Sequence, residues 1–272
     1  MNENRTVRRM EVLSPRGLAE ALRLKAEHPD ALPIQGGTDV MVTLNFDRSR
    51  PATVLNLNEV AELRGWSREN GSLRLGAGLT YAEAMTGELA ALLPALAEAS
   101  RTVGSPQIRN RGTIGGNLGT ASPAGDALPP LAIEDAEVEC ASARGVRRVP
   151  LTDFVTGVKR TALAADELIT AVWVTPSGAP QTFMKVGPRN AMVIAVVALA
   201  VSAGDELRAS IGSASPRPVV VTAPRADAAS FPELVAEAAS PIDDVRGTAA
   251  YRRHALRVLT RRALERTLAA AA

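Results

Sequence analysis

The residues in this chain best suited to chemistry lie in a glycine-rich stretch, Arg109–Asp126. Its sequence is RNRGTIGGNLGTASPAGD, with five glycines among small hydroxyl and amide side chains and an aspartate at the end. Glycine carries no Cβ and tolerates a positive φ, so backbone N–H groups in such a stretch can approach an anion closely. The composition therefore predicts one half of a site for the phosphate groups of a nucleotide.

A second glycine pair supplies the other half of this site. It lies in the segment formed by Ile34, Gln35, Gly36, Gly37, Thr38 and Asp39. Consecutive glycines expose successive N–H groups, and the Thr38 hydroxyl adds a donor, which together suit a pyrophosphate. Asp39 has the wrong charge for a phosphate ligand, so we expect it to cap the next turn or to hold the loop.

The longer stretch repeats this chemistry in the segment formed by Thr113, Ile114, Gly115, Gly116 and Asn117. The amide of Asn117 both donates and accepts, which suits a ribityl chain or a phosphate edge, and the carboxylate of Asp126 accepts from sugar hydroxyls. One glycine pair alone is usually a turn. The two together favour a nucleotide or dinucleotide, and they leave open whether it is an adenylate, a flavin or a nicotinamide.

Other kinds of site find little support in the residues. The chain has no P-loop and no GxSxG motif, and Gly76–Tyr81 lacks the third glycine of a Rossmann fingerprint. His28 and His254 stand in no metal-ligand spacing, so we predict no metal site and expect them at a helix end and on a helix surface. Cys140, the only cysteine, cannot hold an iron–sulfur cluster and is expected to pack in a strand.

The bulk composition excludes several classes of partner. The 272 residues carry a net charge of only +2 and 3% aromatic residues, which predicts neither a nucleic-acid nor a membrane surface. The longest apolar run, Ala191–Ser202, is too short to span a bilayer. The single cysteine and the polar residues 1–11 predict a cytoplasmic chain with no secretory signal.

The elements that must position these residues follow from hydrophobic patterning and capping signals. Ser14 and Pro15 predict the start of a helix that runs to about Ala26, and Thr80 with Glu83 predicts a capping box. Residues 40–44 fit a short helix or a strand equally well. The other expected strands are 31–34 and 53–57 and the hairpins 64–66/72–75 and 136–140/146–150, and the other expected helices are 94–100 and 126–133.

A change of pattern follows the proline-rich segment 175–180, which predicts a linker or long turn. Beyond it, strands are expected at 181–186, 193–201, 207–213 and 218–222, and helices at 231–239 and 249–268. Strands followed by helices predict a small α+β domain at this end of the chain.

The same residues resemble a known family, the FAD-binding (medium) subunits of molybdenum hydroxylases of the xanthine dehydrogenase and carbon monoxide dehydrogenase type. The resemblance covers nearly the whole chain in order, and its longest segment is highly specific. The segments are PIQGGTDVMV (33–42), GSPQIRNRGTIGGNLGTASPAGDALPPLAIEDAEVE (104–139), LTDFVTGVKRTALAADELI (151–169), FMKVGPRNAMVIAVVALAV (183–201), IGSASPRPV (211–219) and DDVRGTAAYRRHALRVLTRRALE (243–265).

This resemblance implies an α+β chain with a defined domain order. Residues 1–176 would form a two-subdomain FAD-binding fold of the vanillyl-alcohol-oxidase (PCMH-like) type. Residues 177–272 would form a C-terminal domain of a small antiparallel sheet with helices.

It also implies roles for particular residues. The loops 35–39 and 113–117 would embrace the FAD pyrophosphate and ribityl chain, and Asp126 would contact the polar chain of the cofactor. Ile169 would lie near the isoalloxazine, and Lys185 would reach the flavin ring and stabilise its reduced anion; without such a role, Lys185 would be a surface strand residue. Many relatives carry a tyrosine beside the flavin where this chain has Phe183, so a phenolic hydrogen bond would be missing and the acceptor preference would differ.

The implied function is that of an oxidoreductase subunit. FAD in this chain would receive electrons from [2Fe–2S] clusters on a small partner subunit, while a large partner subunit would hold the molybdopterin cofactor and the organic substrate. The external acceptor would be NAD⁺, a quinone or oxygen, and the relay requires no catalytic side chain here. Two alternatives are a stand-alone FAD oxidoreductase, for which the histidines are poorly placed, and a scaffold subunit that has lost FAD, which the intact glycines of both loops disfavour.

Overall fold

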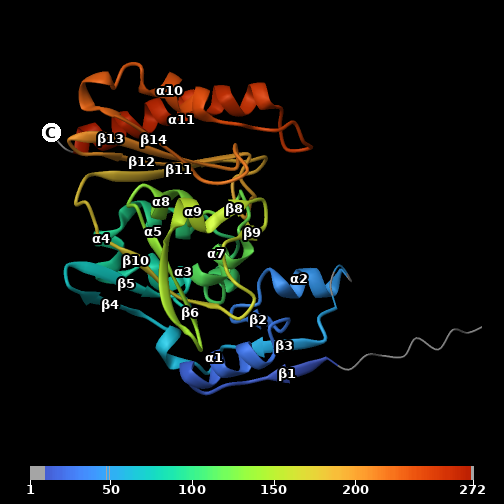
Figure 1. The fold of residues 1–272 in the computed structure, drawn as a ribbon. Helices are drawn as coiled ribbons and strands as arrows, with labels where there is room; N and C mark the ends of the chain where they lie inside the picture. The colour runs from blue at the N-terminus through green and yellow to red at the C-terminus, as the bar shows by residue number, and fades with distance from the viewer. Residues whose placement is uncertain (1–9, 47, 49, 271–272) are drawn as a thin grey trace, which may run out of the picture.

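The computed structural model describes residues 10–46, 48 and 50–270. Its elements stack in three layers (Figure 1). An N-terminal unit lies at one end, a five-stranded sheet with short helices lies in the middle, and a four-stranded sheet covered by two helices lies at the other end. The α+β class predicted from the sequence is confirmed.

The N-terminal unit is a small parallel sheet with the order β1-β3-β2. Its elements are β1 (Glu11–Leu13), α1 (Leu18–Glu27), β2 (Leu32–Ile34), α2 (Val40–Asn45) and β3 (Thr53–Asn56). Residues 40–45 are therefore a helix, which settles the ambiguity left by the sequence. The strand β2 ends where the first glycine loop begins.

The predicted start of the first helix is wrong. The helix α1 begins at Leu18, and its N-cap is Gly17 in extended conformation rather than Ser14. The reason lies in two carboxylates that accept from N–H groups at and just before this start. Glu20 accepts from the N–H of Arg16 at 2.9 Å, and Glu62 accepts from the N–H of Leu18 at 3.0 Å.

The middle layer is a sheet with the order β4-β5-β10-β6-β7. Both predicted hairpins are confirmed, as is the Thr80–Glu83 capping box at the start of α3. Cys140 is fully buried in β6, as expected. The strands are β4 (Trp66–Glu69), β5 (Ser72–Gly76), β6 (Glu137–Ser142), β7 (Gly145–Pro150) and β10 (Leu168–Val174), with a small hairpin of β8 (Val155–Gly157) and β9 (Arg160–Thr161) beside them.

Short helices surround this sheet and bury its apolar face. The helix α7 packs on β10 and carries most of the second glycine loop. The helices are η1 (Ala61–Leu63), α3 (Tyr81–Ala84), α4 (Gly87–Leu92), α5 (Pro94–Thr102), α6 (Pro106–Arg109), α7 (Ile114–Thr120), α8 (Leu128–Ala132) and α9 (Leu151–Phe154).

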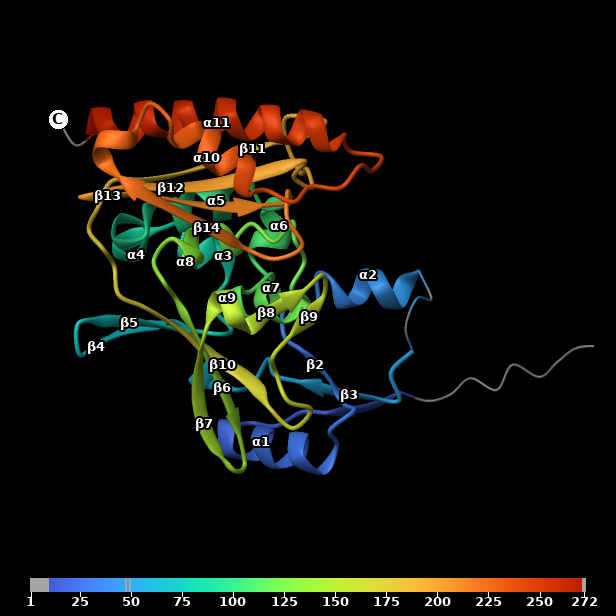
Figure 2. The same cartoon turned by 45° about the horizontal axis from the view of Figure 1, so that its top comes forward.

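The C-terminal layer is an antiparallel sheet with the order β11-β12-β13-β14. The helices α10 and α11 cover one face, and α5 and α8 of the middle layer contact the other face (Figure 2). The sheet therefore lies between two apolar cores. Its elements are β11 (Gln181–Val186), β12 (Val197–Ala203), β13 (Glu206–Gly212), β14 (Val219–Pro224), η2 (Arg225–Asp227), α10 (Phe231–Ala238) and α11 (Ala249–Ala270).

One strand in this layer begins later than predicted. The strand β12 starts at Val197 rather than at residue 193. Residues 187–196 instead form a loop in which Met192 has a φ of 49°. At its end, the N–H of Val196 donates a hydrogen bond to the carbonyl of Val186 at 2.8 Å. None of the helices in the described ranges is long and apolar enough to cross a membrane.

Candidate functional site

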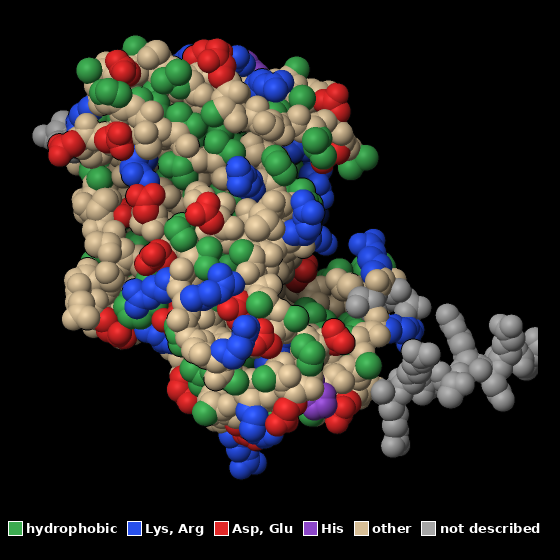
Figure 3. Space-filling model, in the orientation of Figure 1, with side chains coloured by type: hydrophobic (Ala, Val, Ile, Leu, Met, Phe, Trp, Pro, Cys, Tyr) green, Lys and Arg blue, Asp and Glu red, His purple; other side chains and the backbone are tan. Residues whose placement is uncertain are grey.

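The structure brings the two glycine loops into direct contact. A Cβ at Gly36 would lie 2.1 Å from the carbonyl oxygen of Arg111, so no side chain fits at this position. The guanidinium of Arg111 donates to the carbonyl of Gln35 at 3.4 Å and to Asn58 Oδ1 at 3.1 Å. We call residues 34–39 and 111–126 the loop pair. In the space-filling view, a hollow lies where α2 stands out from the body of the molecule, with Lys and Arg side chains on its rim (Figure 3).

The first loop presents unused backbone donors. Gly37 has a φ of +73°, a conformation that glycine adopts without strain. The N–H groups of Gly36, Gly37, Thr38 and Asp39 donate to no acceptor within the described part of the chain. The carboxylate of Asp39 holds the loop, because it accepts from the Thr120 hydroxyl at 3.3 Å. Free N–H groups in succession are the arrangement that binds a phosphate or pyrophosphate.

The second loop does not repeat this arrangement, and that part of the expectation is wrong. The N–H of Ile114 donates to the Leu79 carbonyl at 2.9 Å, and that of Gly115 donates to the Ala77 carbonyl at 2.8 Å. The N–H of Gly116 donates to Thr113 Oγ1 at 3.0 Å, which makes Thr113 the N-cap of α7. The first two bonds fix the helix to the segment that follows β5, and all three donors are already satisfied by the protein.

Glycine serves a different purpose on α7. A Cβ at Gly115 would lie 2.6 Å from the Cβ of Ala77, so this glycine permits close packing of the helix on the chain beneath it. Gly116 and Gly119 are exposed. Because these two positions are three residues apart, they share one smooth face. Ile169 on β10 reaches the edge of that face, since its Cδ1 would lie 3.6 Å from a Cβ at Gly119.

Two buried acceptors near this face have no donor. The side chain of Asn117 lies against Gly125, where a Cβ would come within 2.8 Å of Asn117 Oδ1. Among the residues that the structure describes, Asn117 Oδ1 and Asp126 Oδ1 are buried without a hydrogen-bond partner. Buried polar atoms are almost always satisfied, so these two atoms indicate a ligand that carries hydroxyl or N–H donors.

Asp126 forms a buried ion pair with Lys185. Lys185 Nζ lies 2.6 Å from Asp126 Oδ2, and the exposed fractions of the two side chains are 6% and 8%. Burial raises the pKa of the Asp126 carboxyl, and the Lys185 ammonium offsets this only in part. Lys185 comes from β11, so the pair joins the C-terminal layer to the glycine-rich stretch. The reading of Lys185 as a surface strand residue is therefore wrong.

Phe183 does not lie at an open site. The residue is 5% exposed and packs with the alanines of α5 and β12, while its N–H donates to Glu98 at 2.8 Å. This placement contradicts the expectation that Phe183 stands beside a cofactor. The physical reason is that odd-numbered residues of β11 face α5, and this face is closed at Phe183 and opens only near Lys185.

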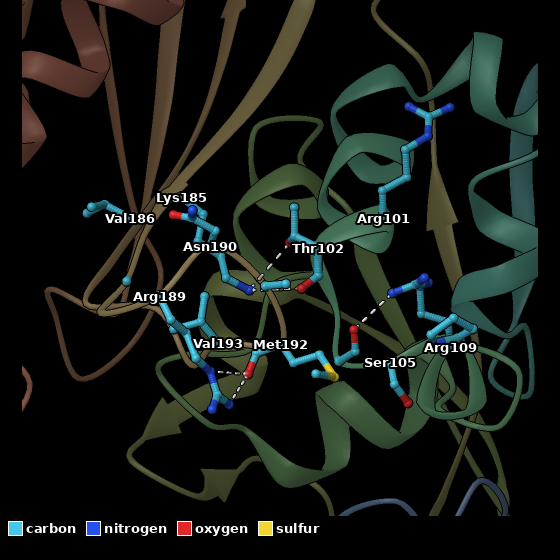
Figure 4. A pocket seen from close by; sticks show the side chains of 14 residues that line it. Arg101, Thr102, Ser105, Arg109, Lys185, Val186, Arg189, Asn190, Met192 and Val193 are labelled. Carbon is cyan, nitrogen blue, oxygen red and sulfur yellow. Dashed lines mark hydrogen bonds between the residues drawn. The ribbon is translucent and has the colours of Figure 1, made fainter.

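A pocket of about 650 Å³ lies on the other side of Lys185. The segment 101–109 forms one wall and the loop 185–193 forms the other, so Arg109 and Arg189 stand on opposite sides (Figure 4). This pocket was not predicted from the sequence. The available signals were Arg109, the first residue of the glycine-rich stretch, and Arg189, which lies far from either glycine loop in the sequence.

The arginines of the pocket are held by main-chain carbonyls. Arg109 donates to the carbonyls of Val103 and Gly104, each at 2.9 Å, and Arg189 donates to that of Met192 at 3.1 Å. Arg101 donates to the Met85 carbonyl at 3.4 Å. In residues 10–46, 48 and 50–270, no carboxylate forms an ion pair with these arginines. Their uncompensated positive charge would favour an anionic ligand.

Comparison with known proteins identifies relatives of the chain. Residues 8–176 match the family model described as the FAD binding domain in molybdopterin dehydrogenase. A xanthine dehydrogenase FAD-binding subunit of Escherichia coli O157:H7 is 31% identical over 93% of this chain and 94% of its own length. The carbon monoxide dehydrogenase medium chain of Afipia carboxidovorans is 31% identical over 94% and 96% of the two chains.

Solved structures show the same fold. A chain of quinoline 2-oxidoreductase from Pseudomonas putida 86 superposes with a TM-score of 0.87 at 27% identity, over 95% of this chain and 96% of that chain. A chain of a cyanide-inactivated Cu,Mo-CO dehydrogenase superposes with a TM-score of 0.88 at 28% identity, over 96% and 98%.

Proposed function

Because this chain belongs to the FAD-binding family of molybdopterin dehydrogenases, we propose that it is the FAD-carrying, electron-transferring subunit of a heteromeric molybdenum hydroxylase. The observation that carries this proposal is the loop pair. It combines free N–H groups for a pyrophosphate with buried acceptors for a hydroxylated chain. A scaffold that had lost its cofactor would not need to keep these polar atoms unsatisfied.

Different residues of the loop pair would bind different parts of the cofactor. The N–H groups of Gly36–Asp39, with the Thr38 hydroxyl, would hold the pyrophosphate. Asn117 and Asp126 would accept from the ribityl hydroxyls. The smooth face of α7 at Gly116 and Gly119, bordered by Ile169, offers a flat surface for a planar ring. In this assignment residues 1–176 form the FAD-binding domain and residues 177–272 form a C-terminal domain that closes it.

Bound FAD would supply the redox chemistry, taking electrons from [2Fe–2S] clusters of a small partner and delivering them to an external acceptor. A large partner would hold the molybdopterin cofactor and the organic substrate. The side chains of this chain bind and orient the cofactor, and none has to act as an acid or base. The buried free thiol of Cys140 is compatible with a reducing compartment and so with a cytoplasmic complex.

The basic pocket is the place where we expect the acceptor to approach. It opens beside Lys185, and Lys185 contacts Asp126 of the proposed cofactor site. An acceptor that carries phosphate groups would be held by Arg101, Arg109 and Arg189. These charges would not strengthen the binding of a neutral quinone or of oxygen.

The test is to express the chain together with the genes that flank it and to purify the complex. We expect one FAD per chain in the visible absorption spectrum, together with a large molybdenum subunit and a small iron–sulfur subunit. A complex without flavin would overturn the redox assignment. A monomer that oxidises a small organic substrate unaided would overturn the subunit assignment and favour the stand-alone flavoenzyme.

A further inference from the structure

Ser213 joins three segments that lie far apart in the sequence. It directly follows β13, and its φ of 62° lies in the left-handed region, which residues other than glycine rarely adopt. Such a conformation persists where the surrounding structure fixes it. The N–H, the hydroxyl and the carbonyl of Ser213 each bond to a different segment, and these three bonds supply that constraint.

Two of the bonds reach the proposed cofactor site and the basic pocket. The N–H of Ser213 donates to the carbonyl of Pro123 at 2.7 Å, within the glycine-rich stretch. The Ser213 hydroxyl donates to the carbonyl of Ala195 at 2.8 Å, near the end of the loop 187–196. One residue of the C-terminal layer therefore connects the glycine-rich stretch to the end of this loop.

The loop 187–196 is consequently held at both ends by the glycine-rich stretch. Just before its start, Lys185 pairs with Asp126, and at its end Ser213 connects it to Pro123. Most of this loop forms one wall of the basic pocket. The position of that wall thus depends on two attachments, and the second of them depends on the conformation of Ser213.

The third bond of Ser213 comes from Arg252 on α11. The Arg252 side chain is only 4% exposed, and its guanidinium donates to the Ser213 carbonyl and, at 2.6 Å, to Asp244 Oδ1. Asp244 also accepts from the N–H groups of Arg246, at 2.8 Å, and Gly247, at 3.3 Å. These bonds, that from Arg246 foremost, hold the pKa of the Asp244 carboxyl below its usual value, so it stays ionised and fixes the guanidinium.

The turn that contains Asp244 also packs on the end of the loop. A Cβ at Gly247 would lie 3.1 Å from Val196 Cγ1, so the glycine permits a close approach of the turn to the chain at this point. The hydroxyl bond from Ser213 and this packing act on the neighbouring residues Ala195 and Val196. The C-terminal layer therefore holds the end of the loop by two separate contacts.

We propose that Arg252 is a positioning residue for the cofactor site and the basic pocket. It holds Ser213 in its left-handed conformation, and Ser213 in turn fixes the glycine-rich stretch at Pro123 and the loop 187–196 at Ala195. This inference rests on the proposed FAD-binding function and deepens it, since it names a residue that orders both sites from outside them. A guanidinium suits this task because its planar fork donates in fixed directions, whereas a lysine ammonium donates from a single point.

The experiment measures hydrogen–deuterium exchange of residues 121–126 and 187–196 in the purified complex, and the FAD dissociation constant after reversible deflavination. For Arg252→Met we expect exchange in both segments to become about tenfold faster, because the constraint on Ser213 is lost. FAD affinity should fall about two- to tenfold, the effect of one lost hydrogen bond. Arg252→Lys should give values between those of the wild type and Arg252→Met.

Two further variants separate the bonds and control for charge. Ser213→Ala removes only the hydroxyl bond to Ala195, so exchange should rise in residues 187–196 alone, and FAD affinity should stay within about twofold of wild type. Arg257→Met is the matched control, because Arg257 lies on the same helix and pairs with Glu233 of α10. Both segments should exchange in this control as they do in the wild type.

Unchanged exchange of both segments in folded Arg252→Met would overturn the proposal. A uniform rise along the whole chain would also overturn it, because Arg252 would then only stabilise the fold. If Arg252→Met does not fold, Arg252→Lys decides by exchange of the same two segments. Absence of FAD from the wild-type complex would refute the proposed function, whereas the exchange measurements would still test the role of Arg252.

Discussion

The Thr120 hydroxyl donates a 3.3 Å hydrogen bond to the Asp39 carboxylate across 81 positions of sequence. This bond ties the end of α7 to the start of α2 and so sets the distance between the two glycine loops. An exposed polar contact of this kind contributes little to global stability. Its value lies in holding the loop pair in one arrangement before a cofactor arrives.

Thr120→Val tests this link. We expect FAD affinity to fall about two- to tenfold, corresponding to one hydrogen bond of about 0.5–1.5 kcal/mol, with no change in melting temperature. Thr43→Val is the matched control, because the Thr43 hydroxyl also bonds Asp39, at 3.3 Å, but through its main-chain carbonyl within α2. Equal FAD binding in wild type and Thr120→Val, measured by flavin fluorescence, would count against the role of the link.

Gly119→Ala should change the stability of helix α7 and the affinity for FAD in opposite directions. Alanine in a helix is favoured over glycine by about 0.5–1 kcal/mol, and a Cβ at position 119 makes only an ordinary 3.6 Å contact with Ile169. The variant without cofactor should therefore melt a few degrees higher, about 2–4 °C.

The same variant should bind FAD more weakly, and Gly119→Leu should bind it more weakly still, because each added atom occupies the smooth face of α7. Calorimetric melting and flavin titration check the two effects separately. Full FAD occupancy in Gly119→Leu would show that the ring does not use this face.

The pairing of Glu167 with Arg147 should make the free energy of unfolding depend on pH. Hydrogen bonds from Arg147, at 2.7 and 2.8 Å, hold the pKa of this carboxyl below its usual value of 4.5 despite burial. Since the folded pKa is depressed, the stabilisation is present above pH 4.5 and is lost as the pH falls through the folded value.

Glu167→Gln should accordingly lower the free energy of unfolding by about 1–2 kcal/mol at pH 7. Urea unfolding of wild type and variant should converge as the pH falls below 4.5. A difference that stays constant over this range would mean that packing, and not charge, accounts for the loss.

Arg189→Leu tests the basic pocket. For an acceptor that carries phosphate, such as NAD⁺, we expect KM to rise about tenfold, the effect of one charge-assisted hydrogen bond. Reoxidation of the reduced complex by oxygen or a neutral quinone should be unchanged. Arg261→Gln, an exposed position on α11, controls for the general loss of positive charge. If Arg189→Leu slowed reoxidation equally with all acceptors, the pocket would not be the site where the acceptor binds.

Local signals in the sequence predicted much of the fold. The Thr80–Glu83 box, the hairpins of the middle layer and the four C-terminal strands follow from residue patterns that act over a few positions. The start of α1 could not be predicted in this way, because Glu62, which accepts from its first N–H, lies 44 positions away. The late start of β12 likewise depends on how residues 187–196 fold back on β11.

The candidate site was predictable in composition but not in hydrogen bonding. The glycines marked both loops, yet only the structure separates the free donors of the first loop from those of the second, which the chain at Ala77–Leu79 satisfies. The same limit applies to Phe183 and Lys185. Both residues lie on one face of β11. Because α5 packs against that face, Phe183 is buried in a core, whereas Lys185 pairs with Asp126.

The union of Asp126 and Lys185 has a consequence for biosynthesis. Lys185 lies 59 positions after Asp126 in the sequence, so the loop pair is synthesised before the counter-ion of this aspartate. Until the C-terminal sheet docks on α5 and α8, Asp126 lacks this partner. On the role proposed for Asp126, full FAD affinity would therefore depend on the folding of the C-terminal layer.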